Sequence, residues 1–128
     1  MKTILMLALF AGAPGTFQVS GKVTGGSGKH AVLVALWREE GFLKGTPVQH
    51  ARFEAGTAPE FHFDVPPGRW ALSAFEDVNG NGTLDMGMFG PKEPSGFSKP
   101  FTAWRAPKFE DVAFTLDRDT ANADIALK

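Results

Sequence analysis

The sequence predicts an all-β protein, built as one antiparallel β-sandwich of about seven short strands with a long irregular loop. Two observations predict this class. Short apolar or alternating runs recur along the chain, and turn residues separate them, among 15 glycines and 9 prolines. No segment has the apolar spacing of an amphipathic helix of three or four turns. The 128 residues suffice for one domain.

The strands are recognised by two kinds of pattern. Residues 17–23, FQVSGKV, alternate between apolar and polar positions, as in a strand with one buried face. Residues 31–37, AVLVALW, form a continuous apolar run that is typical of a central strand buried on both faces. The same reasoning predicts five further strands, at residues 48–55, 60–65, 69–77, 110–117 and 122–128.

The strands at 48–55 and 60–65 are joined by a short loop that contains Gly and Pro. If they pair as a hairpin, one outer face carries His50, Arg52, Glu60, His62 and Asp64. Such a face either holds a metal or is a charged, solvated sheet surface. Regular alternation of this kind is ordinary in antiparallel sheets, and it favours the solvated surface.

The first 13 residues are typical of an export signal. Lys2 supplies the positive start, residues 4–10 form a short apolar run, and residues 11–13 are small, as at a cleavage site. The apolar run is too short for a transmembrane helix. We therefore expect a signal peptide at 1–13, a sandwich domain at 16–128, and a secreted or periplasmic protein. A buried N-terminal strand or helix is the alternative.

Composition excludes several classes of function. A formal net charge of −1 offers no basic surface for nucleic acid, and zero cysteines exclude disulfides and thiol catalysis. The sequence contains neither a G-x-S-x-G nucleophile motif nor a helical H-E-x-x-H metal motif. We expect a protein that is not an enzyme, with a protein or glycan partner in the cell envelope or outside the cell.

Residues 77–85, DVNGNGTLD, match the first nine positions of a calcium-binding loop. Asp77, Asn79 and Asn81 occupy the first, third and fifth positions, and Gly82 occupies the sixth. The backbone carbonyl of Thr83 and the side chain of Asp85 would follow as ligands, so the spacing predicts a calcium site. Asn-Gly and Asp-rich stretches also form plain hairpin turns, which is the alternative.

The twelfth position of this pattern is Met88, where a calcium loop carries a bidentate Glu. The missing carboxylate must come from elsewhere in the chain, or the site is weak. The candidates are Glu76, Glu93, Glu110 and Asp111.

Residues 86–111 have four prolines and no clear strand pattern. Loops this long in compact domains are usually functional or disordered, and the aromatic content argues against disorder. Phe97, Phe101 and Trp104 are candidates for a surface that binds a glycan or a peptide. The alternative, which we prefer, is a small separate core that holds the loop, because this is the commoner role of Phe.

Three segments resemble a bacterial family of small exported proteins classed as a domain of unknown function. They are VPPGRWALSAFEDVNGNGTLD, FGPKEPSGFS and FEDVAFTL, and the likeness extends over residues 17–128. The resemblance implies a seven-stranded sandwich of the transthyretin, carboxypeptidase-regulatory or immunoglobulin type. It implies no activity. The family motif points first to residues 77–85, which we call the Asp/Asn loop, with Asp77, Asn79, Asn81 and Asp85 as its polar residues. It points second to Lys92, Glu93, Glu110 and Asp111.

Overall fold

The computed structural model describes residues 15–84, 86–87, 90–101 and 105–128. The predicted signal peptide at 1–13 lies outside the described residues, as do Asp85 and Trp104. The described part contains ten strands and one short helix: β1 Phe17–Thr24, β2 Val32–Trp37, β3 Gln49–Phe53, β4 Glu60–Val65, β5 Gly68–Glu76, β6 Met86–Gly87, β7 Gly90–Pro91, β8 Ser95–Phe97, α1 Phe109–Val112, β9 Phe114–Leu116 and β10 Ile125–Ala126. The prediction of an all-β protein is confirmed.

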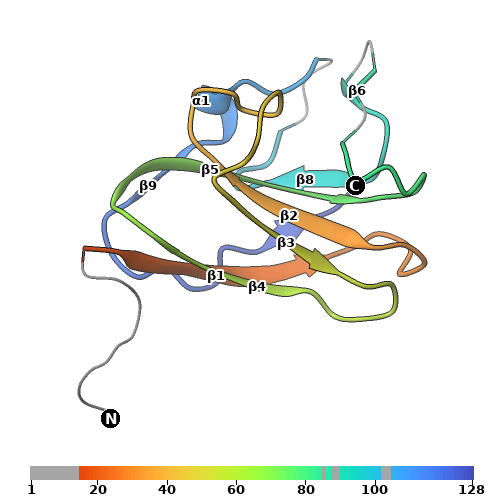
Figure 1. Ribbon diagram of the computed structural model, residues 1–128, viewed down its shortest axis with the longest axis horizontal. Coiled ribbons are helices and arrows are strands. Elements are labelled where there is room, and N and C mark those ends of the chain that lie inside the picture. The colour runs from red at the N-terminus through yellow and green to blue at the C-terminus, as the bar shows by residue number, and fades with distance from the viewer. Residues whose placement is uncertain (1–14, 85, 88–89, 102–104) are drawn as a thin grey trace.

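Two main sheets are formed (Figure 1). One has the strand order β10-β1-β4, and the other has the order β3-β2-β5-β8, with β9 also paired to β5. A separate two-stranded ribbon, β6-β7, lies within the long loop. β8 and β9 both pair with β5, at different positions along the strand. β9 pairs with residues 68–70 and β8 with residues 73–75.

The hairpin considered for residues 48–65 does not form. β3 pairs with β2, and β4 pairs with β1, so the two strands belong to different sheets. Phe61 and Phe63 of β4 are buried in the core, and Phe53 of β3 packs against the same core. Burial of these rings explains the arrangement, since opposite sheets can both direct apolar side chains to one interior. The five polar residues therefore share no single face.

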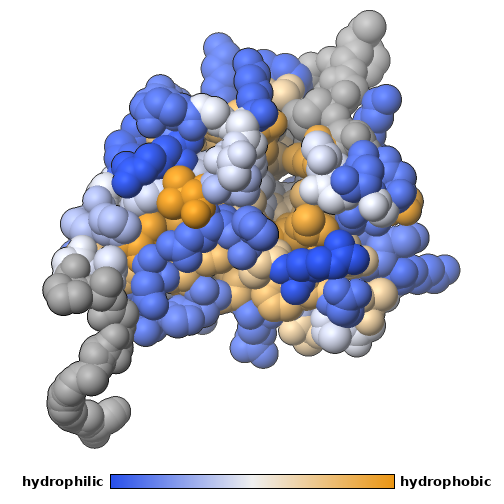
Figure 2. All heavy atoms as spheres, in the orientation of Figure 1, coloured by the Kyte–Doolittle hydropathy of each residue, from blue (hydrophilic) through white to orange (hydrophobic). Residues whose placement is uncertain are grey.

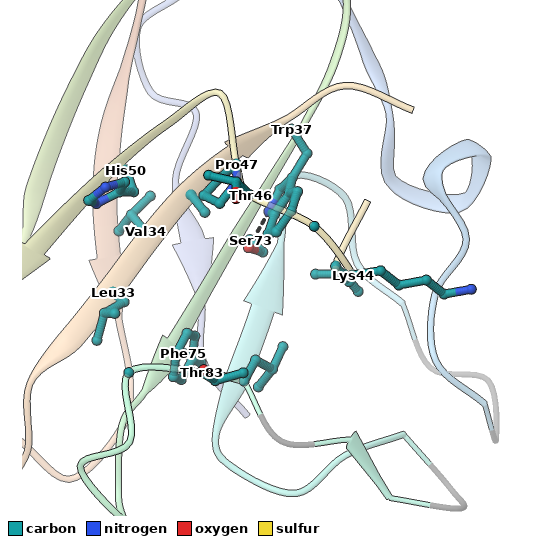
Figure 3. Close-up of a pocket in the computed structure, with 15 residues that line it drawn as sticks. Leu33, Val34, Trp37, Lys44, Thr46, Pro47, His50, Ser73, Phe75 and Thr83 are labelled. Carbon is teal, nitrogen blue, oxygen red and sulfur yellow. Dashed lines mark hydrogen bonds between the residues drawn. The ribbon is translucent and has the colours of Figure 1, made fainter. Parts of the chain in front are cut away.

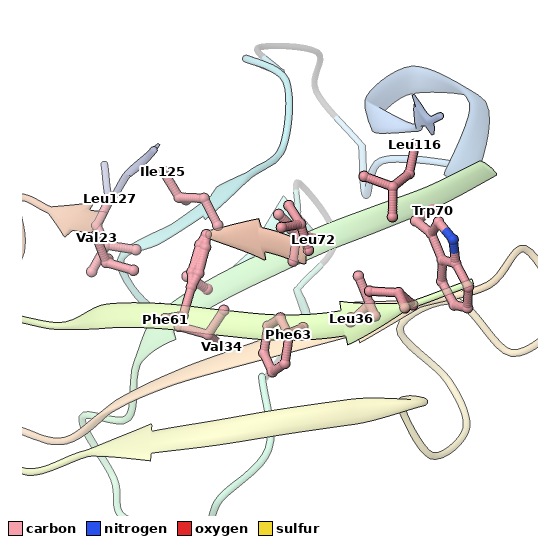
Figure 4. Close-up of a cluster of buried hydrophobic side chains, with 13 residues drawn as sticks. Val23, Val34, Leu36, Phe61, Phe63, Trp70, Leu72, Leu116, Ile125 and Leu127 are labelled. Carbon is pink, nitrogen blue, oxygen red and sulfur yellow. The ribbon is translucent and has the colours of Figure 1, made fainter. Parts of the chain in front are cut away.

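The principal core lies between the two main sheets. Val34, Leu36 and Leu72 contribute from the larger sheet, and Phe61 and Phe63 contribute from the smaller one. Figure 4 shows these side chains directed toward one another between the strands. At about 25 cal/mol per Å² of buried apolar surface, such packing supplies the main stabilising free energy of a domain without disulfides.

The outer face of β5 is covered as well, because all residues from 70 to 77 are buried. A second apolar cluster packs there, comprising Trp37, Phe42, Ala71, Phe109, Val112 and Ala113. The ring of Phe42 meets Trp37 and Phe109 edge to face, at centroid distances of 6.0 and 5.9 Å. α1 and the connection after β2 thus form a partial third layer over the larger sheet.

The strand predicted at 110–117 is wrong in its first half, where α1 forms. The side chain of Asp111 accepts a hydrogen bond from the backbone amide of Lys108 at 2.7 Å, which caps the first turn. Glu110 and Asp111 also place negative charge at the N-terminal end of the helix, where it is favourable. β9 then occupies the second half of the predicted segment.

No helix among the described residues is long and apolar enough to cross a membrane. In the view of Figure 2, hydrophilic residues surround smaller hydrophobic areas.

Candidate functional site

The loop that follows β5 folds back onto its first residue. The backbone amide of Asp77 donates to the carbonyl of Ala31 at 2.8 Å, which fixes the start of the loop to the segment before β2. Oδ2 of Asp77 accepts a hydrogen bond from the amide of Gly82, also at 2.8 Å. Gly80 and Gly82 have φ of 73° and 75°, a left-handed conformation that glycine adopts without strain. The two glycines therefore allow the tight turn that the sequence motif predicts.

Two further side chains organise the same turn. Oδ1 of Asn79 accepts from the amide of Asn81 at 3.2 Å, and Oδ1 of Asn81 accepts from the amide of Thr83 at 3.0 Å. These contacts are Asx turns, in which a short side chain replaces a backbone acceptor. Side-chain amide oxygens are also among the ligands that calcium accepts.

Asp77 is buried, at 3% exposed, and its Oδ1 has no hydrogen-bond partner among the described residues. Leaving a buried polar group unsatisfied costs about 1–3 kcal/mol, and more when the group is charged. The hydrogen bond from Gly82 engages Oδ2, whereas Oδ1 has no such partner among the described residues. The carboxylate is therefore arranged so that one oxygen shapes the loop and the other is available to a cation.

Glu93 is a predicted candidate, distant along the chain, that the fold brings to this loop. It is 7% exposed, and its Oε2 accepts from the amide of Val78 at 2.9 Å, beside Asp77. The segment from β7 to β8 therefore places a second carboxylate against the loop, although Glu93 is 16 positions further along the chain than Asp77.

Glu110 and Asp111 are not brought to the loop. Both carboxylate oxygens of Glu110 accept from Arg69 at 2.9 Å, at the opposite end of β5. Eight residues of strand separate Arg69 from Asp77, or roughly 26 Å. Asp111 pairs with Arg105 at 2.7 Å, and that hydrogen bond, helped by the amide of Lys108, lowers the pKa of Asp111.

No three His, Asp or Glu side chains of the described residues are grouped closely enough to hold a metal ion. A cation in this loop would therefore need amide and backbone oxygens besides carboxylates, and this mixed set is one that calcium accepts.

Glu76, the remaining carboxylate candidate, lies just before the loop in a buried cluster with Ser27 and His30, and this cluster was not predicted from the sequence. Glu76 is 2% exposed and accepts hydrogen bonds from the hydroxyl of Ser27, from the amide of Ser27 at 2.9 Å and from Nδ1 of His30 at 2.8 Å. The hydrogen bond from the Ser27 hydroxyl is the largest cause that lowers the pKa of Glu76 to about 2, against the opposing effect of burial. These contacts attach the turn at residues 25–30 to the end of β5.

One signal in the sequence pointed to this cluster. Glu76 has the same parity along β5 as Trp70, Leu72 and Ala74, which all face the core. A charged residue at a core-facing position requires partners, because an unpaired buried charge is costly.

Comparison with known proteins gives one match. The family described as "Uncharacterized protein conserved in bacteria (DUF2141)" matches residues 22–124. The chain belongs to this family. The match confirms the resemblance to a bacterial domain of unknown function, and it covers the Asp/Asn loop and Glu93. No curated protein and no solved structure matches the chain.

The aromatic residues of the long loop are partly placed in this DUF2141 domain. Phe97 and Phe101 are partly buried and pack against the second apolar cluster. Arg105 also lies over the ring of Phe101, at 5.1 Å from its centroid. These contacts favour the interpretation of the two rings as a small separate core.

Proposed function

We propose that this DUF2141 domain is an exported, non-catalytic module in which the loop after β5 binds a calcium ion. The ligands are the side chains of Asp77, Asn79, Asn81 and Asp85 and the backbone carbonyl of Thr83. The observation that carries the proposal is the buried Oδ1 of Asp77, which has no partner in the described part of the chain. A cation at this oxygen removes the cost of the unsatisfied charge.

The chemistry of the donors fits calcium. Calcium takes six to eight oxygen ligands at flexible geometry and accepts carboxylates, amide carbonyls and backbone carbonyls together. The hydrogen bond from Gly82 to Asp77 and the two Asx turns keep the loop compact around these oxygens. Glu93 is the carboxylate that takes the place of the missing Glu at the twelfth position, since it already contacts the amide next to Asp77.

The role of the ion is structural. An ion that binds the folded state and not the unfolded state raises the free energy of unfolding by RT ln(1 + [L]/Kd), where [L] is the free ion concentration. Extracellular sites with few carboxylates bind with Kd values near the millimolar range. At a concentration of about ten times Kd, the gain is about 1.4 kcal/mol, which raises the melting temperature of a domain of this size by about 4–8 °C.

Two observations support a non-catalytic module of the transthyretin type. The two sheets share one core, as in that class of sandwich. Ser27 and His30 both bind Oε2 of Glu76, so this group lacks the serial Ser–His–carboxylate order of a hydrolase. The alternative function, binding of a glycan or peptide by Phe97, Phe101 and Trp104, gains no support from the two described rings.

Thermal unfolding of metal-stripped protein, with and without calcium, tests the proposal. We expect a rise of several degrees with millimolar calcium, and we expect Asp77→Asn to abolish it. Asn keeps an acceptor for Gly82 while it removes the charge. Asp117→Asn is the matched control, because Asp117 is exposed and forms a surface pair with its neighbour Arg118. An equal loss of stability by Asp77→Asn in calcium and in chelator would show that the residue serves only the turn.

A further inference from the structure

A pocket of about 340 Å³ opens on the outer face of the larger sheet. We call it the outer-face pocket. Its floor is formed by Leu33, Ala35, Trp37, Ser73 and Phe75, and its walls come from residues 43–47 and 82–84. Figure 3 shows Trp37 and Phe75 on either side of Ser73. The volume lies within the range of pockets that bind small molecules.

The cross-strand register explains why a hollow exists here. Leu33 pairs with Phe75, and Ala35 pairs with Ser73, in adjacent rows across β2 and β5. Side chains in paired positions lie on the same face of a sheet. The small pair therefore leaves a gap beside the large one, and Trp37 closes its other side. The pocket is thus built into two central strands and does not depend on a loop alone.

Ser73 supplies a hydrogen-bond donor at the floor. It is 3% exposed, and its Oγ accepts from Nε1 of Trp37 at 2.9 Å. A serine hydroxyl also carries one proton to donate, and no acceptor for it is found among the described residues. The indole thus orients the hydroxyl while its proton stays available to an acceptor on a ligand.

The charges around the outer-face pocket favour a negative ligand. Among the described residues, its lining contains Lys44 and His50 and no Asp or Glu. His50 of β3 pairs with Ala35 of β2, so it lies in the same cross-strand row as Ala35 and Ser73. In Figure 3 the Lys44 side chain extends away from the other labelled residues, and its ammonium adds positive charge near the pocket.

We infer that the outer-face pocket binds a small aromatic carboxylate. The ring lies over Ala35 between Trp37 and Phe75, where edge or offset contacts with aromatic rings are favourable. The carboxylate accepts a hydrogen bond from the Ser73 hydroxyl.

The affinity of the pocket for the carboxylate is coupled to calcium binding, and this coupling rests on the proposed function. Gly82, Thr83 and Leu84 belong both to the Asp/Asn loop and to the pocket wall. An ion that fixes the loop fixes the wall, so calcium increases the affinity for the carboxylate. By linkage, the carboxylate then increases the affinity for calcium by the same factor.

Calorimetric titration with 2-naphthoate tests the pocket. We expect saturable binding to the wild type, binding at least tenfold weaker to Ser73→Ala, and none to Ala35→Leu, whose side chain fills the gap. Ser95→Ala is the matched control, because Ser95 lies on the same sheet outside the pocket lining and should bind as the wild type does. Neutral 2-naphthamide should bind more weakly than the acid.

The absence of saturable binding to the wild type would overturn the inference, as would equal binding to Ser73→Ala with an unchanged melting temperature. Repeating the titration in chelator and in calcium separates the two proposals. Binding that is equal in both media overturns the linkage alone. A calcium-dependent melting temperature without any naphthoate binding overturns the pocket and leaves the calcium site.

Discussion

Among single residues, Glu76 shows how a charge is accommodated in the core-facing row of β5. Its carboxylate is buried, yet three donors from Ser27 and His30 surround it. Hydrogen bonds to the charged form lower a pKa, whereas burial raises it. Here the hydrogen bonds dominate, because the pKa is about 2 and the ordinary value is 4.5. The ionised state therefore contributes to the free energy of unfolding.

The pH dependence of stability follows from this shift. Because the pKa of Glu76 is lower in the folded state, its contribution is complete above about pH 4.5 and is lost as the pH falls toward 2. We expect wild-type stability to fall in this window more steeply than that of Glu76→Gln. Urea unfolding at pH 7, 4 and 3 measures the difference.

At pH 7 the substitution Glu76→Gln should lower the free energy of unfolding by about 1–3 kcal/mol, because the donors of Ser27 and His30 lose their charged acceptor. Glu54→Gln is the matched control, since Glu54 is exposed and makes a surface pair with Arg52. If the stability of the wild type and of Glu76→Gln changed in parallel with pH, the assignment of this acid-dependent loss of stability to Glu76 would be contradicted.

Among the elements, β8 and β10 lie unusually close to each other. A Cβ placed on Gly96 would lie 2.3 Å from the carbonyl oxygen of Ala126 and 2.7 Å from the side chain of Ile125. A backbone atom cannot move aside as a flexible side chain can, so glycine is required at this crossing. Its role is to let the last strand approach the edge of the larger sheet.

The corresponding prediction is that Gly96→Ala destabilises the domain by about 1–3 kcal/mol, as overpacking does. Chemical denaturation measures the change. Gly45→Ala is the control, because a Cβ there meets only ordinary contacts at 3.7 Å. If both variants unfold at the same denaturant concentration, β8 and β10 do not constrain each other.

The elements with strong periodicity were predictable from sequence, and those made by tertiary contacts were not. The alternation of residues 17–23 and the apolar run of 31–37 correspond to β1 and β2. α1 has only four residues and depends on the Asp111 cap, so no helical period announces it. β3 pairs with β2, whereas β4 joins β1 in the other sheet. This division depends on packing between the two sheets, which a local sequence pattern does not reveal.

The candidate site follows the same division. The spacing of Asp77, Asn79 and Gly82 predicted a turn that the fold contains. Choosing Glu93 over Glu110 required the register of β8 and β9 along β5, because both residues look alike in the sequence. Ser73 was unpredictable as a donor, since its role depends on the indole of a neighbouring strand.

For the whole molecule, the absence of cysteine means that the two-sheet core must provide the stability without disulfides. Export itself stays a prediction. β1 begins at Phe17, downstream of the small residues at 11–13, so cleavage after Ala13 would leave β1 complete. Mass spectrometry of the protein collected from the periplasm or medium should find a chain that begins near Pro14. A mass that includes Met1 would contradict the signal peptide.

The end of the described chain joins both sheets. Val23 of β1 pairs with Ile125 in parallel, and Lys128 exchanges two backbone hydrogen bonds with Ser95 beside β8. A ribosome makes residues 125–128 after every other strand described here. Until then, the edges of β1 and β8 lack their partner, and pairing across about a hundred residues is intrinsically slow. The folded arrangement of β1 and β8 therefore stays incomplete until residues 125–128 have been made.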